Sequence, residues 1–146
     1  FLGNALAARA ESLFLKNHIE HVLNCVNVHE VPNYFEKKGI DYLNLNLADQ
    51  PHPELFNAQD YFKKGVEFIH QAISNHRNVF VHCVGGQNRS PSLVIAYLIA
   101  YHSDRFKTVK DAYLFLHNIR SLIAVNITYV KQLSVFHENL VKQGSG

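Results

Sequence analysis

The chain has 146 residues, of which 47% are hydrophobic, with a mean hydropathy of −0.10, a net charge of +2 at pH 7 and a pI near 8.6. This composition supplies enough apolar surface for the core of one domain, and the charge is too small to indicate binding to nucleic acid or to an anionic membrane. The longest apolar run, residues 93–101, is far shorter than the roughly 18 residues of a membrane span.

The first half of the chain predicts, in order, a strand-like start at residues 1–2, a helix over 5–16, and strands over 21–28 and 40–47. On the helix, Leu6, Ala10 and Leu13 share one face, which we expect to pack into the core. In the second of these strands leucines alternate with asparagines over residues 43–47, as in a half-exposed strand.

The second half predicts a helix over 57–75, a short strand over 78–82, and helices over 90–102, 108–121 and 127–142. Two of these helices carry apolar residues at helical spacing that we expect in the core: Phe62, Val66, Ile69, Ile73, Tyr129, Leu133, Phe136 and Leu140. The alternation predicts an α/β domain over residues 1–143, with a mixed central sheet flanked by helices, and a floppy end or cloning remnant at 144–146.

A cysteine and an arginine six positions apart, Cys83 and Arg89, follow the strand over 78–82 and enclose Gly85 and Gly86. Glycines permit positive φ, so backbone N–H groups and the start of the next helix can point at one bound anion. A helix N-terminus and a nearby cation also favour the thiolate form of a cysteine. The pattern therefore predicts a cysteine nucleophile that attacks a bound phosphate. The alternatives are a buried structural cysteine followed by a surface arginine, and a sulfur carrier of the rhodanese type.

Each residue of this segment has a role suited to its chemistry. The planar guanidinium of Arg89 matches two phosphate oxygens. The hydroxyl of Ser90 either donates to the sulfur or caps the following helix. His82 either orients the loop through hydrogen bonds to the loop backbone and tunes the thiol, or is an ordinary core histidine at a strand end. The predicted phosphate-binding loop consists of Val84, Gly85, Gly86, Gln87, Asn88 and Arg89.

Residues 82–98 resemble the signature of the dual-specificity protein phosphatases, within the cysteine-based protein tyrosine phosphatase superfamily. Segments 1–4, 21–24, 32–36 and 42–49, and Arg120 followed by Asn126, resemble other parts of that family in the same order. Three positions depart from it: Asn88 replaces a serine or another small residue, Gly85 a frequent alanine, and Val125 a proline. The resemblance covers residues 1 to about 140 and implies a protein tyrosine phosphatase-like fold.

Phosphate-ester cleavage also needs an acid that protonates the leaving group. The resemblance implies that this acid is Asp49, with Asn126 as a supporting residue. The local sequence supports this role in part, because Asp49 follows the end of a predicted strand, in a loop stiffened by Pro51 and Pro53. The alternative is an ordinary turn aspartate, in which case Glu54 and Asp60 are the substitutes.

The resemblance implies a phosphatase that hydrolyses phosphotyrosine and phosphoserine/threonine in proteins through a phosphocysteine, without a metal or organic cofactor. The partners are then phosphorylated proteins, with neither nucleic acid nor membrane expected. The alternatives are a phosphatase for RNA 5′ ends or another non-protein phosphate, and a binding module that captures phosphorylated partners without turnover. The ten histidines show no zinc-site spacing and are interpreted as mostly surface residues.

Two cysteines do not form a disulfide framework. A catalytic thiol favours a reducing compartment, the cytosol or the nucleus, and no N-terminal targeting segment is visible. A regulatory or docking region before residue 1 stays open. We expect Cys25 to be buried in mid-strand packing; a protective disulfide with Cys83 is the alternative.

Overall fold

The computed structural model describes residues 1–50 and 58–144. In this part of the chain a four-stranded sheet has the order β1-β4-β2-β3. Its strands are β1 (Leu2–Gly3), β2 (Ile19–Asn24), β3 (Asp41–Asn44) and β4 (Asn78–His82). Every pairing is parallel, which requires a crossover between successive strands. The α/β prediction is confirmed, with a parallel sheet where we expected a mixed one.

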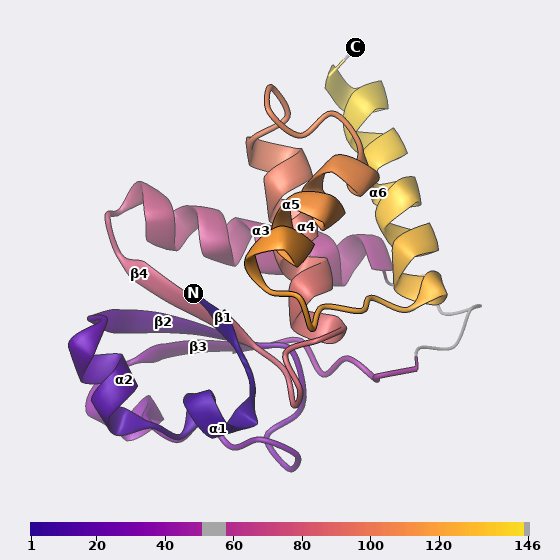
Figure 1. The fold of residues 1–146 in the computed structure, drawn as a ribbon. Helices are drawn as coiled ribbons and strands as arrows, with labels where there is room; N and C mark the ends of the chain where they lie inside the picture. Colours follow the sequence, from indigo (N-terminus) through magenta and orange to yellow (C-terminus); the bar gives the residue numbers. More distant parts are fainter. Residues whose placement is uncertain (51–57, 145–146) are drawn as a thin grey trace.

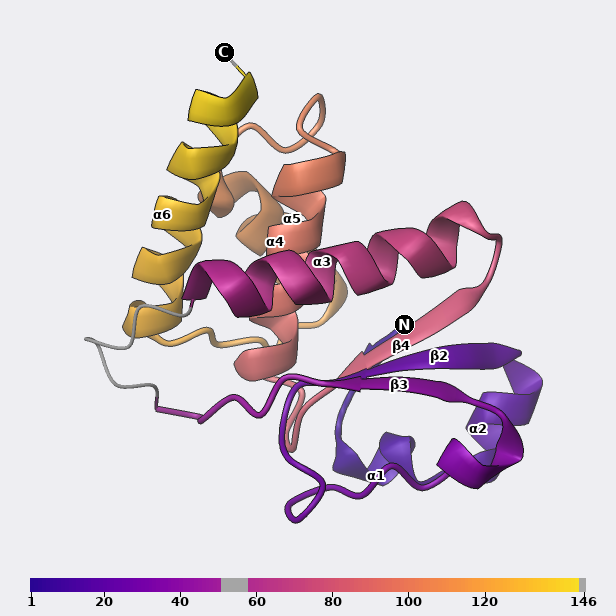
Figure 2. The same ribbon diagram turned by 180° about the vertical axis from the view of Figure 1, so that it is seen from behind.

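Helices cover both faces of the sheet (Figure 1). The short helices α1 (Ala5–Ala8) and α2 (Glu11–Lys16) lie on one face, and η1 (Glu36–Lys38) precedes β3. The other face carries α3 (Ala58–Ser74), α4 (Arg89–Tyr101), α5 (Val109–Ile119) and α6 (Ile127–Gly144). Seen from behind, α3 runs across the front of α4 and α5, above β2 and β3, while α6 stands at the side of α4 and α5 (Figure 2). This part of the chain contains no helix with both the length and the apolar character of a membrane span.

The main core lies between the sheet and the larger helical layer. Phe62, Leu93, Ile95 and Leu133 are fully buried there. Gly65 permits this packing, because a Cβ at that position would collide with Cδ1 of Leu93. Helix α4 is therefore enclosed on most sides, and this rigid setting holds its first turn at the end of β4.

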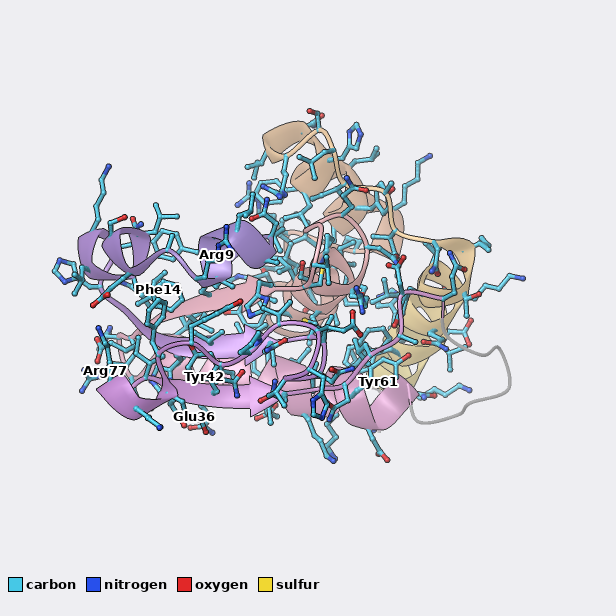
Figure 3. The ribbon with its side chains drawn as sticks, turned by 90° about the horizontal axis from the view of Figure 1, so that it is seen from below. Arg9, Phe14, Glu36, Tyr42, Tyr61 and Arg77 are labelled. Carbon is cyan, nitrogen blue, oxygen red and sulfur yellow. The ribbon has the colours of Figure 1, made fainter. Side chains whose placement is uncertain are left out.

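The N-terminal helix differs from the prediction. It is broken into α1 and α2, because Ala10 adopts an extended conformation with ψ 92° between them. As a result Leu6 and Leu13 are 65% and 42% exposed, whereas Ala8 and Phe14 are buried. Figure 3 shows Phe14 beside the strands; its ring centroid lies 4.6 Å from that of Phe35 and 5.7 Å from that of Phe80. This segment therefore contacts the core through Phe14 rather than through the predicted face of Leu6 and Leu13.

The remaining elements follow the prediction with shorter strands. The strand over 78–82 is confirmed, and the last three helices agree to within two residues at either end. The strands predicted to reach residues 28 and 47 end at Asn24 and Asn44, the latter before a positive φ of 56° at Asn46. On α3, Ile73 is 45% exposed rather than in the core. The predicted helix start at residue 57 and the predicted loop residues Pro51, Pro53 and Glu54 lie outside the described residues.

Candidate active site

The loop over residues 83–88 joins β4 to α4, as the sequence predicts. It lies at the carboxyl edge of the parallel strands, where ligand sites form in open α/β sheets. A cavity of about 390 Å³ opens there. Its lining combines this loop with residues from three distant segments: Glu30, Asp49, Gln50, Cys83, Val84, Gly85, Gln87, Asn88, Arg89, Ala124 and Asn126.

Cys83 lies at the buried end of this loop, with 2% of its surface exposed. Its Sγ is 3.1 Å from Oγ of Ser90 and accepts a hydrogen bond of 3.2 Å from the backbone N–H of Gly86. Gly86 reaches this position with a φ of +69°, a left-handed conformation that glycine adopts without a steric cost. The Ser90 hydroxyl, the Gly86 N–H and the start of α4 therefore surround the sulfur.

Arg89 is 5% exposed and only partly paired. Its Nη1 donates to the carbonyl oxygen of Leu47 at 3.1 Å and lies 3.5 Å from Oε2 of Glu30. Its Nε lies 3.8 Å from Oδ1 of Asp49 and has no hydrogen-bond partner. A buried donor without a partner is costly, and a phosphate bound in the cavity would satisfy it. Glu30 was not predicted as a site residue, because it is distant in sequence and belongs to no motif.

Asp49 lines the same cavity with its side chain 65% exposed. Its backbone carbonyl accepts hydrogen bonds from Nδ2 of Asn88 at 2.8 Å and from Nδ2 of Asn126 at 2.7 Å. The hydroxyl of Tyr129 donates to the neighbouring carbonyl of Ala48. Burial raises the pKa of Tyr129, so this hydroxyl stays protonated as a donor. No local pattern indicates that Tyr129, predicted only as a core residue, contacts this loop.

His82 is fully buried directly before Cys83. Its Nδ1 lies 3.1 Å from the carbonyl oxygen of Cys83, which can only accept, so Nδ1 carries the hydrogen. Burial lowers the pKa of His82 while this hydrogen bond raises it. The contact joins the ring to the first carbonyl of the loop, and the full burial of His82 equally fits a core histidine.

Cys25 lies one residue past β2, where its N–H donates to the carbonyl oxygen of His82 at 2.9 Å. It is fully buried, and burial raises its pKa. Both cysteines are free thiols, and the buried packing predicted for Cys25 is confirmed. The alternative acid Asp60 lines a different cavity, between α3 and α6. Within residues 1–50 and 58–144, no group of three or more histidine, cysteine, aspartate or glutamate side chains is arranged to hold a metal ion.

A family model described as "Dual specificity phosphatase, catalytic domain" matches residues 1–139. The chain belongs to this family. Among dual specificity phosphatases it is similar to human "Dual specificity protein phosphatase 9", at 32% identity over 100% of this chain and 38% of that protein. It is 31% identical to human "Dual specificity protein phosphatase 21", covering 97% of this chain and 73% of that one. The chain thus spans well under half of the first relative and about three quarters of the second.

Solved structures of other proteins share the fold. A variant of human DUSP28 superposes with a TM-score of 0.83 at 23% identity, covering 98% of this chain and 92% of that one. DUSP15 superposes with a TM-score of 0.80 at 27% identity, covering 97% of this chain and 87% of that one. PTPMT1, solved in complex with PI(5)P, superposes with a TM-score of 0.79 at 24% identity, covering 98% of this chain and 90% of that one. The predicted family and its tyrosine phosphatase-like fold are confirmed.

Proposed function

We propose that this chain is a cysteine-dependent phosphatase that hydrolyses phosphotyrosine and phosphoserine/threonine in proteins through a phosphocysteine intermediate. One observation carries the proposal: the Cys83 sulfur, in contact with the Gly86 N–H and the Ser90 hydroxyl, and the partly unpaired guanidinium of Arg89 line one cavity. A nucleophile beneath a set of donors is what phosphoryl transfer requires, because its catalysis depends on positioning and charge stabilisation.

In the first step the Cys83 thiolate attacks phosphorus in line. The S–P bond forms as the bond from phosphorus to the ester oxygen breaks, and protonated Asp49 gives its proton to that oxygen. Arg89 and the N–H groups of the loop stabilise the three equatorial oxygens.

In the second step water attacks the phosphocysteine. Its proton passes to the Asp49 carboxylate as the S–P bond breaks, which releases inorganic phosphate and returns Asp49 to its acid form. The Ser90 hydroxyl, 3.1 Å from the sulfur, donates to the departing thiolate. No step in this scheme draws on a metal or an organic cofactor.

The charges around the cavity favour a single phosphate monoester. The cavity lining combines one cation, Arg89, with two carboxylates, Glu30 and Asp49. A 5′-triphosphate or a phosphoinositide with several phosphates would bring further negative charge next to the carboxylate of Glu30, which repels it, whereas Asp49 is protonated when the substrate binds. A phosphorylated side chain of a protein carries only one such group.

Turnover of an aryl phosphate tests the proposal. We expect wild-type activity that Cys83→Ser abolishes and that Asp49→Asn lowers about 10²- to 10⁴-fold in kcat, with loss of one limb of the pH profile. Phosphopeptides should be better substrates than triphosphate-ended RNA. Binding of phosphopeptides without any turnover would instead establish the binding module, and a preference for the RNA would overturn the substrate assignment.

A further inference from the structure

Asn88 connects three segments that are far apart in sequence. Its Nδ2 donates to the backbone carbonyl of Asp49 at 2.8 Å and to Oδ1 of the Asp49 side chain at 3.1 Å. Its Oδ1 accepts the backbone N–H of Asn126 at 2.8 Å. The phosphate loop, the acid loop and the segment before α6 therefore meet at one amide group.

The orientation of this amide follows from its partners. The backbone N–H of Asn126 can only donate, so the oxygen of the Asn88 amide faces Asn126 and the NH₂ group faces Asp49. The amide of Asn126 is fixed in the same way, because its Oδ1 accepts the N–H of Tyr129 at 3.0 Å. Both asparagines consequently present donors to Asp49.

The two oxygens of the Asp49 carboxyl differ in their surroundings. Oδ1 accepts the hydrogen bond from Asn88 and is the oxygen that lies 3.8 Å from Nε of Arg89. An oxygen next to a donor and a cation binds a proton less readily than its neighbour. Both contacts engage Oδ1, so in the mechanism proposed above Oδ2 would be the oxygen that carries the proton donated to the leaving group.

We propose that Asn88 is a positioning residue for the general acid: its amide holds Oδ1 of Asp49 as an acceptor and directs the proton-bearing Oδ2 toward the substrate. This role rests on the proposed function. It is specific to the asparagine, because the family usually has serine or another small residue at this position, and a serine has one hydroxyl hydrogen. That single donor cannot serve both the backbone carbonyl and Oδ1 of Asp49 while the serine oxygen also accepts the N–H of Asn126.

Asn88→Ser tests the role with a series of aryl phosphates whose leaving phenols range from strongly to weakly acidic. General-acid catalysis matters most for the weakly acidic phenols, which are poor leaving groups. We expect kcat to fall about tenfold for these and little for the most acidic phenol, with KM nearly unchanged. Asn75→Ser, the same change at the exposed end of α3, is the matched control and should keep the wild-type profile.

A double-mutant cycle with Asp49→Asn separates this role from a structural one. If Asn88 acts through Asp49, Asn88→Ser causes no further loss in the Asp49→Asn background. Asn88→Asp is a second variant, which keeps the acceptor for Asn126 but places a carboxylate against Asp49. It should lose at least as much activity on the poor leaving groups as Asn88→Ser.

Two results would overturn the role of Asn88. One is a leaving-group profile of Asn88→Ser that matches the wild type; the other is a double mutant whose losses multiply. Formation of the phosphocysteine by the wild-type protein is measured first, with the most acidic phenol. Its absence would refute the proposed function itself, whereas its presence together with either result above would refute only the role of Asn88.

Discussion

Gly86 is the position where a single methyl group should disrupt the phosphate loop most. Its φ of +69° lies in the left-handed region, where an alanine costs about 1–2 kcal/mol. A Cβ there would lie 2.9 Å from the carbonyl oxygen of Gly3 and would also contact Nη2 of Arg120. Gly3 is fixed by its pairing with His82 in β4, so the loop rather than the strand must move.

Such overpacking costs about 1–3 kcal/mol, so Gly86→Ala should lower the free energy of unfolding by roughly 2–5 kcal/mol. The movement would also displace the N–H that donates to the Cys83 sulfur at 3.2 Å. We therefore expect turnover of an aryl phosphate to fall together with stability. Urea unfolding followed by circular dichroism measures the first effect, and steady-state kinetics the second.

Gly85→Ala is the matched control for stability. A Cβ at Gly85 would meet only the Gln87 side chain, at 3.8 Å, and Gly85 is not among the glycines with positive φ. Its substitution should change the free energy of unfolding by less than about 1 kcal/mol. Equal destabilisation by the two substitutions, or a loss below about 1 kcal/mol for Gly86→Ala, would refute this reasoning.

Three further predictions concern stability and the second chemical step. Burial lowers the pKa of His82 from 6.5, so below about pH 6.5 the unfolded chain binds a proton that the folded chain does not, and stability is lost as the pH falls. His82→Gln should therefore make the urea unfolding midpoint less dependent on pH in that range. An unchanged pH dependence would contradict this. Phe62→Ala should lower the free energy of unfolding by about 3–5 kcal/mol. Ile73→Ala on the same helix, where the side chain is 45% exposed, should lower it by less than about 1 kcal/mol. Similar losses for the two variants would contradict the packing described for α3. Ser90→Ala should slow phosphocysteine hydrolysis more than its formation and produce a burst of phenol in stopped-flow kinetics; slowing of both steps alike would remove Ser90 from sulfur departure.

The strand, loop and helix around Cys83 could be predicted because their signals are local. An apolar run, two glycines and a helix start lie within a few residues of one another, so little depends on distant contacts. The position of Asp49 at the cavity was expected from the family resemblance and from the leucine alternation that precedes it. At Val125, which replaces the family's proline, the N–H donates to the Tyr113 hydroxyl at 3.3 Å, and the adjoining Asn126 contacts the carbonyl of Asp49.

Other features of the site depend on loops that meet only in the folded chain. The contact of Glu30 with Arg89 and the hydrogen bonds of Asn88 and Tyr129 join residues 38 to 81 positions apart. The break between α1 and α2 has no local signal either. Ala10 is a good helix former, and its extended conformation is explained by the burial of Phe14 against Phe35 and Phe80.

The most direct test of the account is to trap the covalent intermediate. The protein is mixed with an aryl phosphate, quenched in acid within the first turnover, digested and analysed by mass spectrometry. We predict one added phosphoryl group on the peptide that contains Cys83, and none in Cys83→Ser. Steady turnover with no phosphoryl group on that peptide, or with the group on another residue, would contradict the assignment of Cys83 as the nucleophile.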